Sequence, residues 1–234
     1  ALTVRNIDLP RKVKYKPRRK HKESVNNNQA YRIGRTYEDF QKYMAEHPES
    51  NVVEMDTVEG TREGKVLLTM LFRNSSFMLI FLMPANTQEC VQNVFNRIDS
   101  ILGTNRMKEL FPIILTDNGS EFKNPNSIEC TEDGDIRTRV FYCDPHKSWQ
   151  KARIEKNHEF IRYIVPKGKP FDSYEQKDIT LISNHINSIA RASLNERTPF
   201  ELATLLLDDV LLKALELHAI PYDEVLLKPA LLKR

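Results

Sequence analysis

The stretch FPIILTDNGSEF, residues 111–122, is where the fold of this chain can first be read. Its apolar residues 113–115 predict a short buried strand, because a short apolar run bounded by turn residues is typical of a core strand. Asp117 follows at once, and the Asn118-Gly119 pair predicts a turn after it. A single carboxylate at a strand end is weak evidence of a site. The interpretation therefore depends on whether other segments bring partners to Asp117.

Four further stretches predict strands. Residues 51–58 alternate so that Glu54 and Asp56 share one face of a strand, while Val53 and Met55 share the other. The remaining strands are predicted at 65–72, 77–83 and 139–143, with the first two joined by a turn of hairpin length.

Helices are predicted where apolar residues recur at helical spacing, at 36–47, 86–102 and 149–165, with further helices after residue 173. Ser148 is the expected N-cap of the third helix. Two capping boxes are expected, Ser173 with Gln176 and Thr198 with Glu201, the second opening one or two short helices. A hairpin followed by strand–helix–strand predicts an α/β fold, a mixed sheet with helices packed on its faces.

Three acidic residues fall at places where this fold brings segments together. Asp56 lies in the first strand, Asp117 follows the fourth, and Glu155 lies early in the helix after the fifth. Clustered carboxylates raise one another's pKa unless a cation neutralises them. Mg²⁺ prefers such oxygen ligands, and two ions held by shared carboxylates can act on a phosphodiester. With 32 acidic residues in the chain, such a placement also arises by chance.

Composition narrows the class of protein. The three cysteines have no CxxC spacing, which argues against a disulfide framework or a structural zinc site. The longest apolar run, residues 77–83, is far shorter than a membrane span, so no membrane association is expected. Residues 1–35 carry eleven basic and two acidic residues, a net charge of +9, whereas the remaining residues have a net charge of −6. Such a basic arm is expected either to bind a polyanion or to serve as a solvated linker.

Three blocks of sequence together resemble the catalytic core of DDE transposases. The blocks are EMDTVEG at 54–60, TDNGSEF at 116–122 and DPHKSWQKARIEKNHEFIRYIVPKG at 144–168. Among these enzymes the chain looks most like the bacterial insertion-sequence transposase family numbered thirty, and ASLNERTPFEL at 192–202 is similar to a C-terminal segment of that family. Ala152 and the His158-Glu159 pair depart from the family pattern, which has a glycine and an Asn-Gly pair there.

The resemblance implies a ribonuclease H-like fold, a mixed five-stranded sheet flanked by helices, as in retroviral integrases. It implies three parts: a basic arm with a short helix (1–48), the catalytic core (49–195) and a C-terminal helical extension (196–234). It also implies that Asp56, Asp117 and Glu155 are the catalytic and metal-binding triad, holding two Mg²⁺ ions for which Mn²⁺ can substitute. The family's N-terminal helix-turn-helix region is not found, so the chain is expected to be a fragment or to have lost it.

The implied function is metal-dependent DNA strand cleavage and strand transfer, the activity of a polynucleotidyl transferase and endonuclease. The expected partners are double-stranded DNA, both transposon ends and target, and further copies of the chain in a homo-oligomer. The expected location is the bacterial cytoplasm, near the nucleoid. Two alternatives stay open: a ribonuclease H-like nuclease that only hydrolyses, and a non-catalytic DNA-binding module with a relic fold.

Basic residues in two places are expected to contact DNA. One group lies in the arm and the other around Glu155: Lys12, Lys14, Arg18, Arg19 and Lys20; Lys151, Arg153, Lys156, Arg162 and Lys167. The second group also fits a helix that simply interleaves Lys and Glu for solubility.

Four other residues near the triad have open or structural interpretations. Glu54 either tunes the site indirectly or lies at the surface, and Glu121 is interpreted as structural, at a helix start. Glu159 is a less favoured third ligand than Glu155, and Trp149 is expected to anchor the core rather than to stack on a base.

Overall fold

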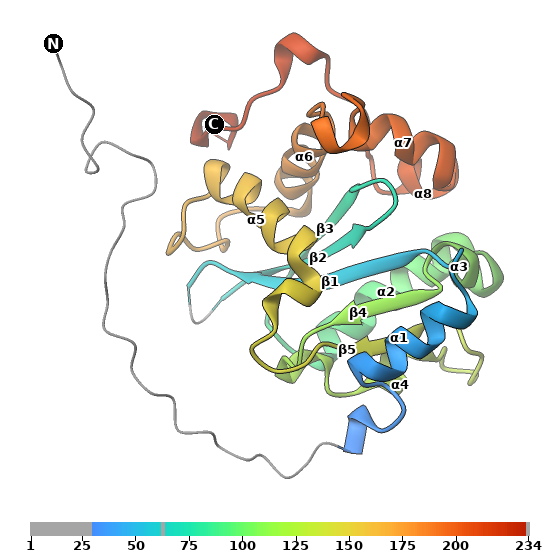
Figure 1. The fold of residues 1–234 in the computed structure, drawn as a ribbon. Helices are drawn as coiled ribbons and strands as arrows, with labels where there is room; N and C mark the ends of the chain where they lie inside the picture. The colour runs from blue at the N-terminus through green and yellow to red at the C-terminus, as the bar shows by residue number, and fades with distance from the viewer. Residues whose placement is uncertain (1–29, 62–63, 233–234) are drawn as a thin grey trace, which may run out of the picture.

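The computed structural model describes residues 30–61 and 64–232, and its core is a five-stranded mixed sheet. The strands are β1 (Val52–Glu59), β2 (Val66–Phe72), β3 (Met78–Met83), β4 (Ile113–Thr116) and β5 (Arg139–Tyr142), in the order β3-β2-β1-β4-β5. Strand β2 runs antiparallel to both of its neighbours, while β1, β4 and β5 are parallel (Figure 1). The parallel strands are joined by connections that carry helices, as such connections require.

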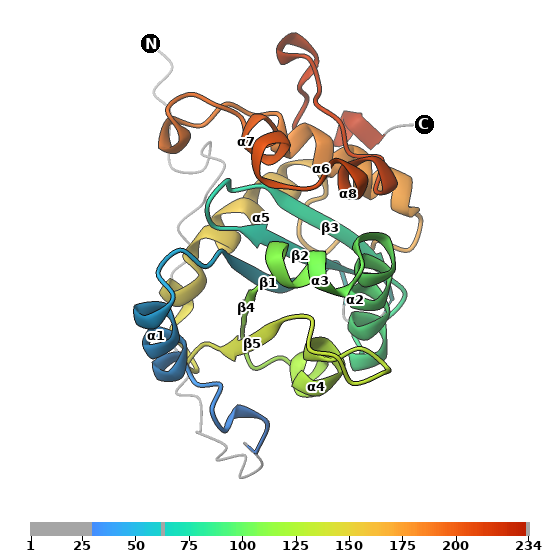
Figure 2. The same cartoon turned by 90° about the vertical axis from the view of Figure 1, so that its right-hand side faces the viewer.

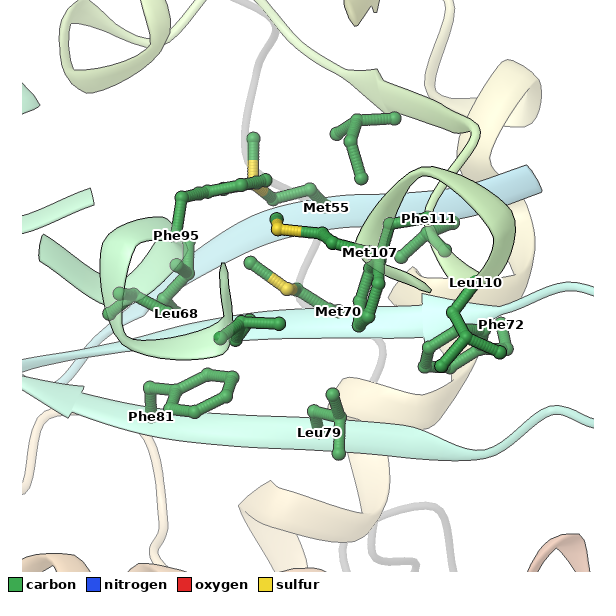
Figure 3. Close-up of a cluster of buried hydrophobic side chains, with 14 of the residues drawn as sticks. Met55, Leu68, Met70, Phe72, Leu79, Phe81, Phe95, Met107, Leu110 and Phe111 are labelled. Atoms are coloured by element: carbon green, nitrogen blue, oxygen red, sulfur yellow. The ribbon is translucent and has the colours of Figure 1, made fainter. Parts of the chain in front are cut away.

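One face of the sheet packs against helices α2 (Gln88–Leu102), α3 (Thr104–Leu110) and α4 (Pro125–Glu129), and against α7 (Pro199–Leu206) and α8 (Asp209–Ala214). Alternate residues of every strand point to this face, because successive side chains of a strand alternate between its two sides. Met55, Met70, Phe72 and Phe111 are among the buried side chains of this cluster (Figure 3). Residues of α7 and α8 belong to the same cluster, so they pack with the sheet rather than apart from it.

The opposite face carries α1 (Tyr37–Glu46), α5 (Ala152–Ile164) and α6 (Gln176–Asn187). Helices α5 and α6 cover β1, β2 and β3, while α1 lies over β4 and β5 (Figures 1 and 2). Glu54 and Asp56 point to this face, because Val53 and Met55 point to the other. The carboxylates of Glu54 and Asp56 therefore lie on the face of the sheet that α5 covers.

The sequence predicted most of these elements. The five strands, the helices at 36–47 and 86–102, and the capping box of Thr198 with Glu201 are confirmed. The ribonuclease H-like fold, a mixed five-stranded sheet flanked by helices, is confirmed as well. The division at residues 48 and 195 stays a prediction.

Some local predictions were wrong. Ser148 is not an N-cap but begins a 3-10 turn, Ser148–Lys151, that leads into α5. The capping box of α6 uses Glu175 and Asp178, because the backbone first becomes helical two residues later than expected. Helices α3 and α4 were not predicted, since each is too short to show a helical period.

No helix within the described residues is long and apolar enough to cross a membrane.

Candidate active site

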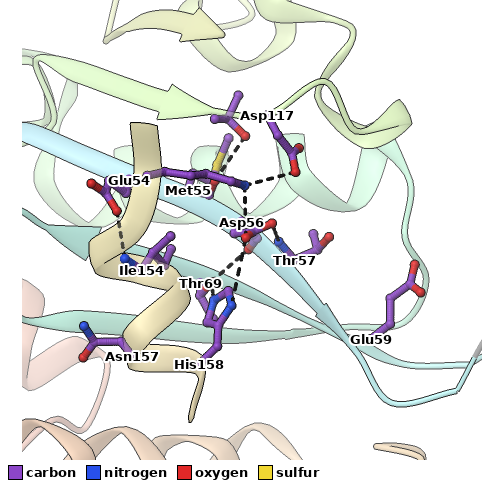
Figure 4. A network of polar contacts seen from close by, with 12 residues as sticks. Glu54, Met55, Asp56, Thr57, Glu59, Thr69, Asp117, Ile154, Asn157 and His158 are labelled. Atoms are coloured by element: carbon purple, nitrogen blue, oxygen red, sulfur yellow. Dashed lines mark hydrogen bonds and ion pairs between the residues drawn. The ribbon is translucent and has the colours of Figure 1, made fainter. Parts of the chain in front are cut away.

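The strands bring Asp56 and Asp117 side by side. Strand β1 pairs in parallel with β4 so that Val52, Val53 and Glu54 lie opposite Ile113, Ile114 and Leu115. Continuing this register by two residues places Asp56 opposite Asp117, immediately beyond the last residue of β4. The two carboxylates meet where β4 ends beside β1, which continues past Asp56 to Glu59 (Figure 4). Sites of α/β sheets commonly lie beyond the carboxyl ends of strands, as Asp117 does.

A lysine lies between these two carboxylates. Lys151 Nζ is 3.0 Å from Asp56 Oδ2 and 3.0 Å from Asp117 Oδ2. The lysine side chain is only 6% exposed, although it comes from the short 3-10 turn before α5. A buried charge is costly without an ion partner, and here one ammonium serves two carboxylates. Lys151 was predicted from the sequence to contact DNA, but in the structure it is buried between the two aspartates.

The electrostatics follow from burial and from these ion pairs. Burial raises the pKa of Asp56 to about 6, the Lys151 charge opposes this rise, and the neighbouring Asp117 carboxylate adds to it. Burial lowers the pKa of Lys151, but the two carboxylates outweigh it, so the pKa is raised overall and the lysine stays charged.

The second oxygen of each carboxylate is held by the backbone. Asp56 Oδ1 accepts a hydrogen bond from the Thr57 N–H at 2.9 Å, and Asp117 Oδ1 accepts one from the Gly119 N–H at 3.0 Å. Each aspartate is thereby fixed in orientation, and both Oδ2 atoms point to the position of the lysine nitrogen. The predicted turn at Asn118-Gly119 thus has a direct part in aiming Asp117.

His158, from α5, lies beside Asp56 and contacts Thr69 of β2. Its Nε2 lies 2.9 Å from Thr69 Oγ1, and its Nδ1 lies 4.0 Å from Asp56 Oδ2 (Figure 4). The single hydroxyl proton of Thr69 is donated to the Asp56 carbonyl, so Nε2 must carry the proton that it donates to Thr69. Burial, assisted by the charges of Lys151 and Arg162, lowers the pKa of His158 to about 3, which keeps the imidazole neutral.

Glu54 fixes the helix that carries Glu155. Its carboxylate is 1% exposed, and Oε2 accepts a hydrogen bond from the Ile154 N–H in the first turn of α5 at 2.8 Å. Oε1 accepts one from Arg73 Nε at 2.7 Å, and Arg73 also donates to the Gln150 carbonyl. The possibility that Glu54 lies at the surface is excluded. An acid at a helix N-terminus is favoured by the helix dipole and satisfies a backbone donor that the helix leaves free.

Glu121 is also buried beside the site. It belongs to a 3-10 turn, Ser120–Phe122, and its Oε1 accepts a hydrogen bond from Thr57 Oγ1 at 2.7 Å. The prediction that Glu121 opens a helical turn is confirmed. Its contact with the residue after Asp56 helps to hold the end of β1 against the loop after β4.

Glu155 lies close to the pair but does not join it. It is exposed, and together with Asp117 and Lys151 it lines a hollow of about 300 Å³. Asp56 and His158 line a neighbouring hollow of about 690 Å³, which Asp117 also borders. Within the described residues, no three His, Cys, Asp or Glu side chains gather closely enough to hold a metal ion.

Apart from Lys151, which lies between the two aspartates, the basic residues predicted to contact DNA form three groups. Those of the arm, between Lys12 and Lys20, lie outside the described residues. Arg153 and Lys156 line a groove of about 1000 Å³ beside α5. Arg162 and Lys167 line the hollow that contains Asp56.

Two side chains near the site were misjudged from the sequence. Trp149 does not anchor the core: it is 65% exposed and stands edge-on to Tyr37, with ring centroids 6.1 Å apart. The part played by Lys151 was missed, although its position one helical turn before Glu155 could have indicated that both point to the same site.

The two aspartates fit a divalent cation by their chemistry. Carboxylate oxygens are the ligands that Mg²⁺ prefers, and two of them already converge on one positively charged group. Glu155 lines the same hollow as Asp117, whereas Asp56 lines the neighbouring one. The cationic position is occupied by the lysine, so the fit requires Lys151 to move.

The chain is similar in sequence to several curated proteins. No protein-family model matches the chain. The chain is 28% identical to the transposase for insertion sequence element IS4351 of Bacteroides fragilis over 149 residues, 64% of this chain and 43% of that protein. It is 26% identical to transposase InsI for insertion sequence element IS30C of Escherichia coli K12 over 149 residues, 64% of this chain and 37% of that protein.

The chain thus spans less than half the length of these curated relatives. Among solved structures, the catalytic core domain of BIV integrase is 16% identical and covers 67% of this chain and 95% of its own, with a TM-score of 0.46. The resemblance to insertion-sequence transposases, elements of the IS30 type among them, is confirmed.

Proposed function

We propose that this chain is the catalytic core of a DDE-type insertion-sequence transposase, which cleaves DNA strands and joins them to new sites. The observation that carries the proposal is the convergence of Asp56 and Asp117, from adjacent parallel strands, on one cationic position. Carboxylates placed in this way can hold the metal ions that assist phosphoryl transfer. The relatives named above are transposases, which supports the same reaction class.

Asp56, Asp117 and Glu155 would hold the metal, Mg²⁺ or Mn²⁺. When bound, the ions would neutralise the carboxylates, activate the attacking oxygen and stabilise the leaving oxygen of a phosphodiester. The surrounding residues keep the ligands in place: Thr57 and Gly119 fix the aspartates, and Glu54 fixes the first turn of the Glu155 helix. Such fixed geometry is how the protein accelerates an in-line transfer.

Arg162 and Lys167 favour a DNA strand in the hollow next to Asp56. Both line that hollow, and the Arg162 side chain donates a hydrogen bond to the Glu59 carbonyl at 2.7 Å, which holds it at the hollow's wall. A guanidinium and an ammonium in such a place suit phosphate oxygens. Arg153 and Lys156, in the groove on another side of α5, would contact DNA farther from the reacting bond.

Double-stranded DNA is the proposed substrate, first the end of the element and then the target. Water would attack a phosphodiester at the element's end, leaving a 3′-hydroxyl on the element and a 5′-phosphate on the flanking strand. That hydroxyl would then attack a phosphodiester of the target strand, forming the new ester bond and releasing the target's own 3′-hydroxyl. Joining two element ends to one target needs two active sites, so a homo-oligomer is proposed as the working form.

The test uses the purified chain with Mg²⁺ or Mn²⁺ and duplex DNA taken from the sequences that flank its own gene. Asp56→Asn, Asp117→Asn and Glu155→Gln should each lower strand cleavage by about 100-fold or more, since each removes a metal ligand. Glu159→Gln, a matched change one turn farther along α5, should leave cleavage near wild type. If all three triad variants cleave like the wild type, the proposal fails.

One observation favours a second candidate, a DNA-binding module without catalysis. Lys151 holds the cationic position and Glu155 is exposed, so the two aspartates are already paired without a metal. Mn²⁺ binding that depends on Asp56 and Asp117 would exclude this candidate. A nuclease that only hydrolyses would give cleavage without any strand-transfer product.

A further inference from the structure

We infer that Lys151 is a displaceable counter-ion that holds the two-aspartate site closed to metal until DNA draws the lysine away, so that metal and DNA bind cooperatively. The inference rests on the proposed function, because it assumes that Asp56 and Asp117 are the metal ligands.

The first step of the argument is that lysine and metal compete for the same two oxygens. The Oδ1 atoms of Asp56 and Asp117 are engaged by the backbone N–H groups of Thr57 and Gly119. The two Oδ2 atoms remain, and both lie 3.0 Å from Lys151 Nζ. A Mg²⁺ ion binds carboxylate oxygens at about 2.1 Å, so it would stand against the ammonium and be repelled by it. The lysine must therefore leave before a metal can use these oxygens.

The second step is that Lys151 has somewhere to go. It belongs to the 3-10 turn Ser148–Lys151, outside the regular hydrogen bonding of α5, and its long side chain has four rotatable bonds. It already lines the hollow of about 300 Å³ that it shares with Glu155 and the exposed residues Lys147 and Ser148. A change of side-chain rotamer into this hollow would release the aspartates without moving the helix.

The third step is that charge selects a phosphate as the group that draws the lysine out. The two aspartates and one ammonium carry one net negative charge in the metal-free site, and the exposed Glu155 beside them adds a second, so the site repels DNA. After the exchange, a divalent ion would neutralise the two aspartates, and the freed ammonium would pair with one phosphate. The ammonium, a compact point charge, suits a phosphate well. Lys151 would thus contact DNA only in the metal-loaded state.

This exchange makes metal and DNA affinities reciprocal. If DNA favours the outward lysine, it raises the affinity for metal, and metal must raise the affinity for DNA by the same factor. A site built in this way stays closed to free divalent ions when no substrate is present.

The test measures Mn²⁺ binding by electron paramagnetic resonance in the wild-type chain and in two variants. Lys151→Met keeps an unbranched side chain of similar length and removes the charge. Lys147→Met is the matched control, because Lys147 is four residues away, half-exposed and paired with Asp144 rather than with either aspartate of the site. Lys151→Met should bind Mn²⁺ about 5- to 150-fold more tightly than wild type, the usual range of coupling between sites, while Lys147→Met should not.

The same titrations are repeated with a short random-sequence duplex. The duplex should tighten Mn²⁺ binding by the wild type and by Lys147→Met, but not by Lys151→Met, in which the lysine is already absent. Equal Mn²⁺ affinity in all three proteins would refute the counter-ion role of Lys151 and leave the proposed metal site standing. No Mn²⁺ binding by any of them overturns the proposed metal site itself, and this inference with it.

A second measurement uses only the wild-type protein and so does not depend on the folding of a variant. Reductive methylation followed by peptide mass spectrometry reports how accessible each lysine nitrogen is. Lys151 should be protected without metal and should react once Mn²⁺ and the duplex are added, whereas Lys147 should react in both cases. Unchanged protection of Lys151 under conditions in which Mn²⁺ binding is measured would refute the displacement.

Discussion

Replacing Glu54 by glutamine should destabilise the protein far more than a similar change at the surface. The glutamate accepts from Arg73 Nε through Oε1 and from the Ile154 N–H through Oε2, at 2.7 and 2.8 Å. A glutamine amide has only one oxygen, so either the arginine or the helix N-terminus would face an NH₂ group. Leaving a buried donor unpaired costs about 1–3 kcal/mol.

The loss of charge adds to this cost. Removing one partner of a buried ion pair costs about 3–5 kcal/mol, and the partial exposure of Arg73, at 27%, reduces that figure. We therefore expect Glu54→Gln to lower the free energy of unfolding by about 3 kcal/mol in total. For a domain of this size the melting temperature would fall by about 6–12 °C.

The assay is urea denaturation followed by far-ultraviolet circular dichroism, with Glu109→Gln as the matched control. Glu109 also pairs with an arginine, Arg106, at 2.5 Å, but the two side chains are 63% and 43% exposed. An exposed pair contributes at most about 1 kcal/mol. Hydrogen exchange should also quicken in the first turn of α5 for Glu54→Gln. If the two variants lose the same stability, burial is not what gives the Glu54 pair its strength.

Three other predictions concern pH, a buried arginine and the basic arm. The pKa of Asp56 is about 6 in the folded protein, above its ordinary 3.8, so the folded state binds that proton more tightly. The free energy of unfolding of the metal-free protein should fall as pH rises from about 4 to about 6, and Asp56→Asn should remove that component in urea titrations at several pH values. Arg137 is fully buried, and its guanidinium donates to Asn96 and to two backbone carbonyls of α4. Arg137→Met should therefore cost about 3 kcal/mol in the same denaturation assay, and a loss below about 1 kcal/mol would contradict this. Deleting residues 1–29 should flatten the salt dependence of DNA affinity measured by fluorescence anisotropy, whose slope is about −0.9 per phosphate neutralised, and an unchanged slope would remove the arm from the interface.

The order of elements and their faces could be predicted because they depend on local periodicity. The alternation in residues 51–58 correctly placed Glu54 and Asp56 opposite the core residues Val53 and Met55. The predictions that were missing or wrong concern elements that are short or whose bounds depend on backbone hydrogen bonds. Helix α4 has five residues, and the start of α6 is set by Glu175 and Asp178, whose two reciprocal hydrogen bonds are not visible in an apolar pattern.

For the candidate site, the sequence by itself determined which acids could take part. Asp56 lies in the first strand, Asp117 follows the fourth and Glu155 comes early in a helix, and the three motif blocks place them in order. Only the tertiary structure decided how they meet. The parallel pairing of β1 with β4 sets Asp56 against Asp117, and the turn before α5 inserts Lys151 between them.

Lys151 comes from a segment 34 residues beyond Asp117 in the chain. Its spacing from Glu155 indicates at most a shared helix face, and does not reveal the contact with the two aspartates. Ion pairing across such a separation is a property of three-dimensional distance and burial. The sequence therefore indicated which carboxylates could form the site, while the fold determined which cation neutralises them.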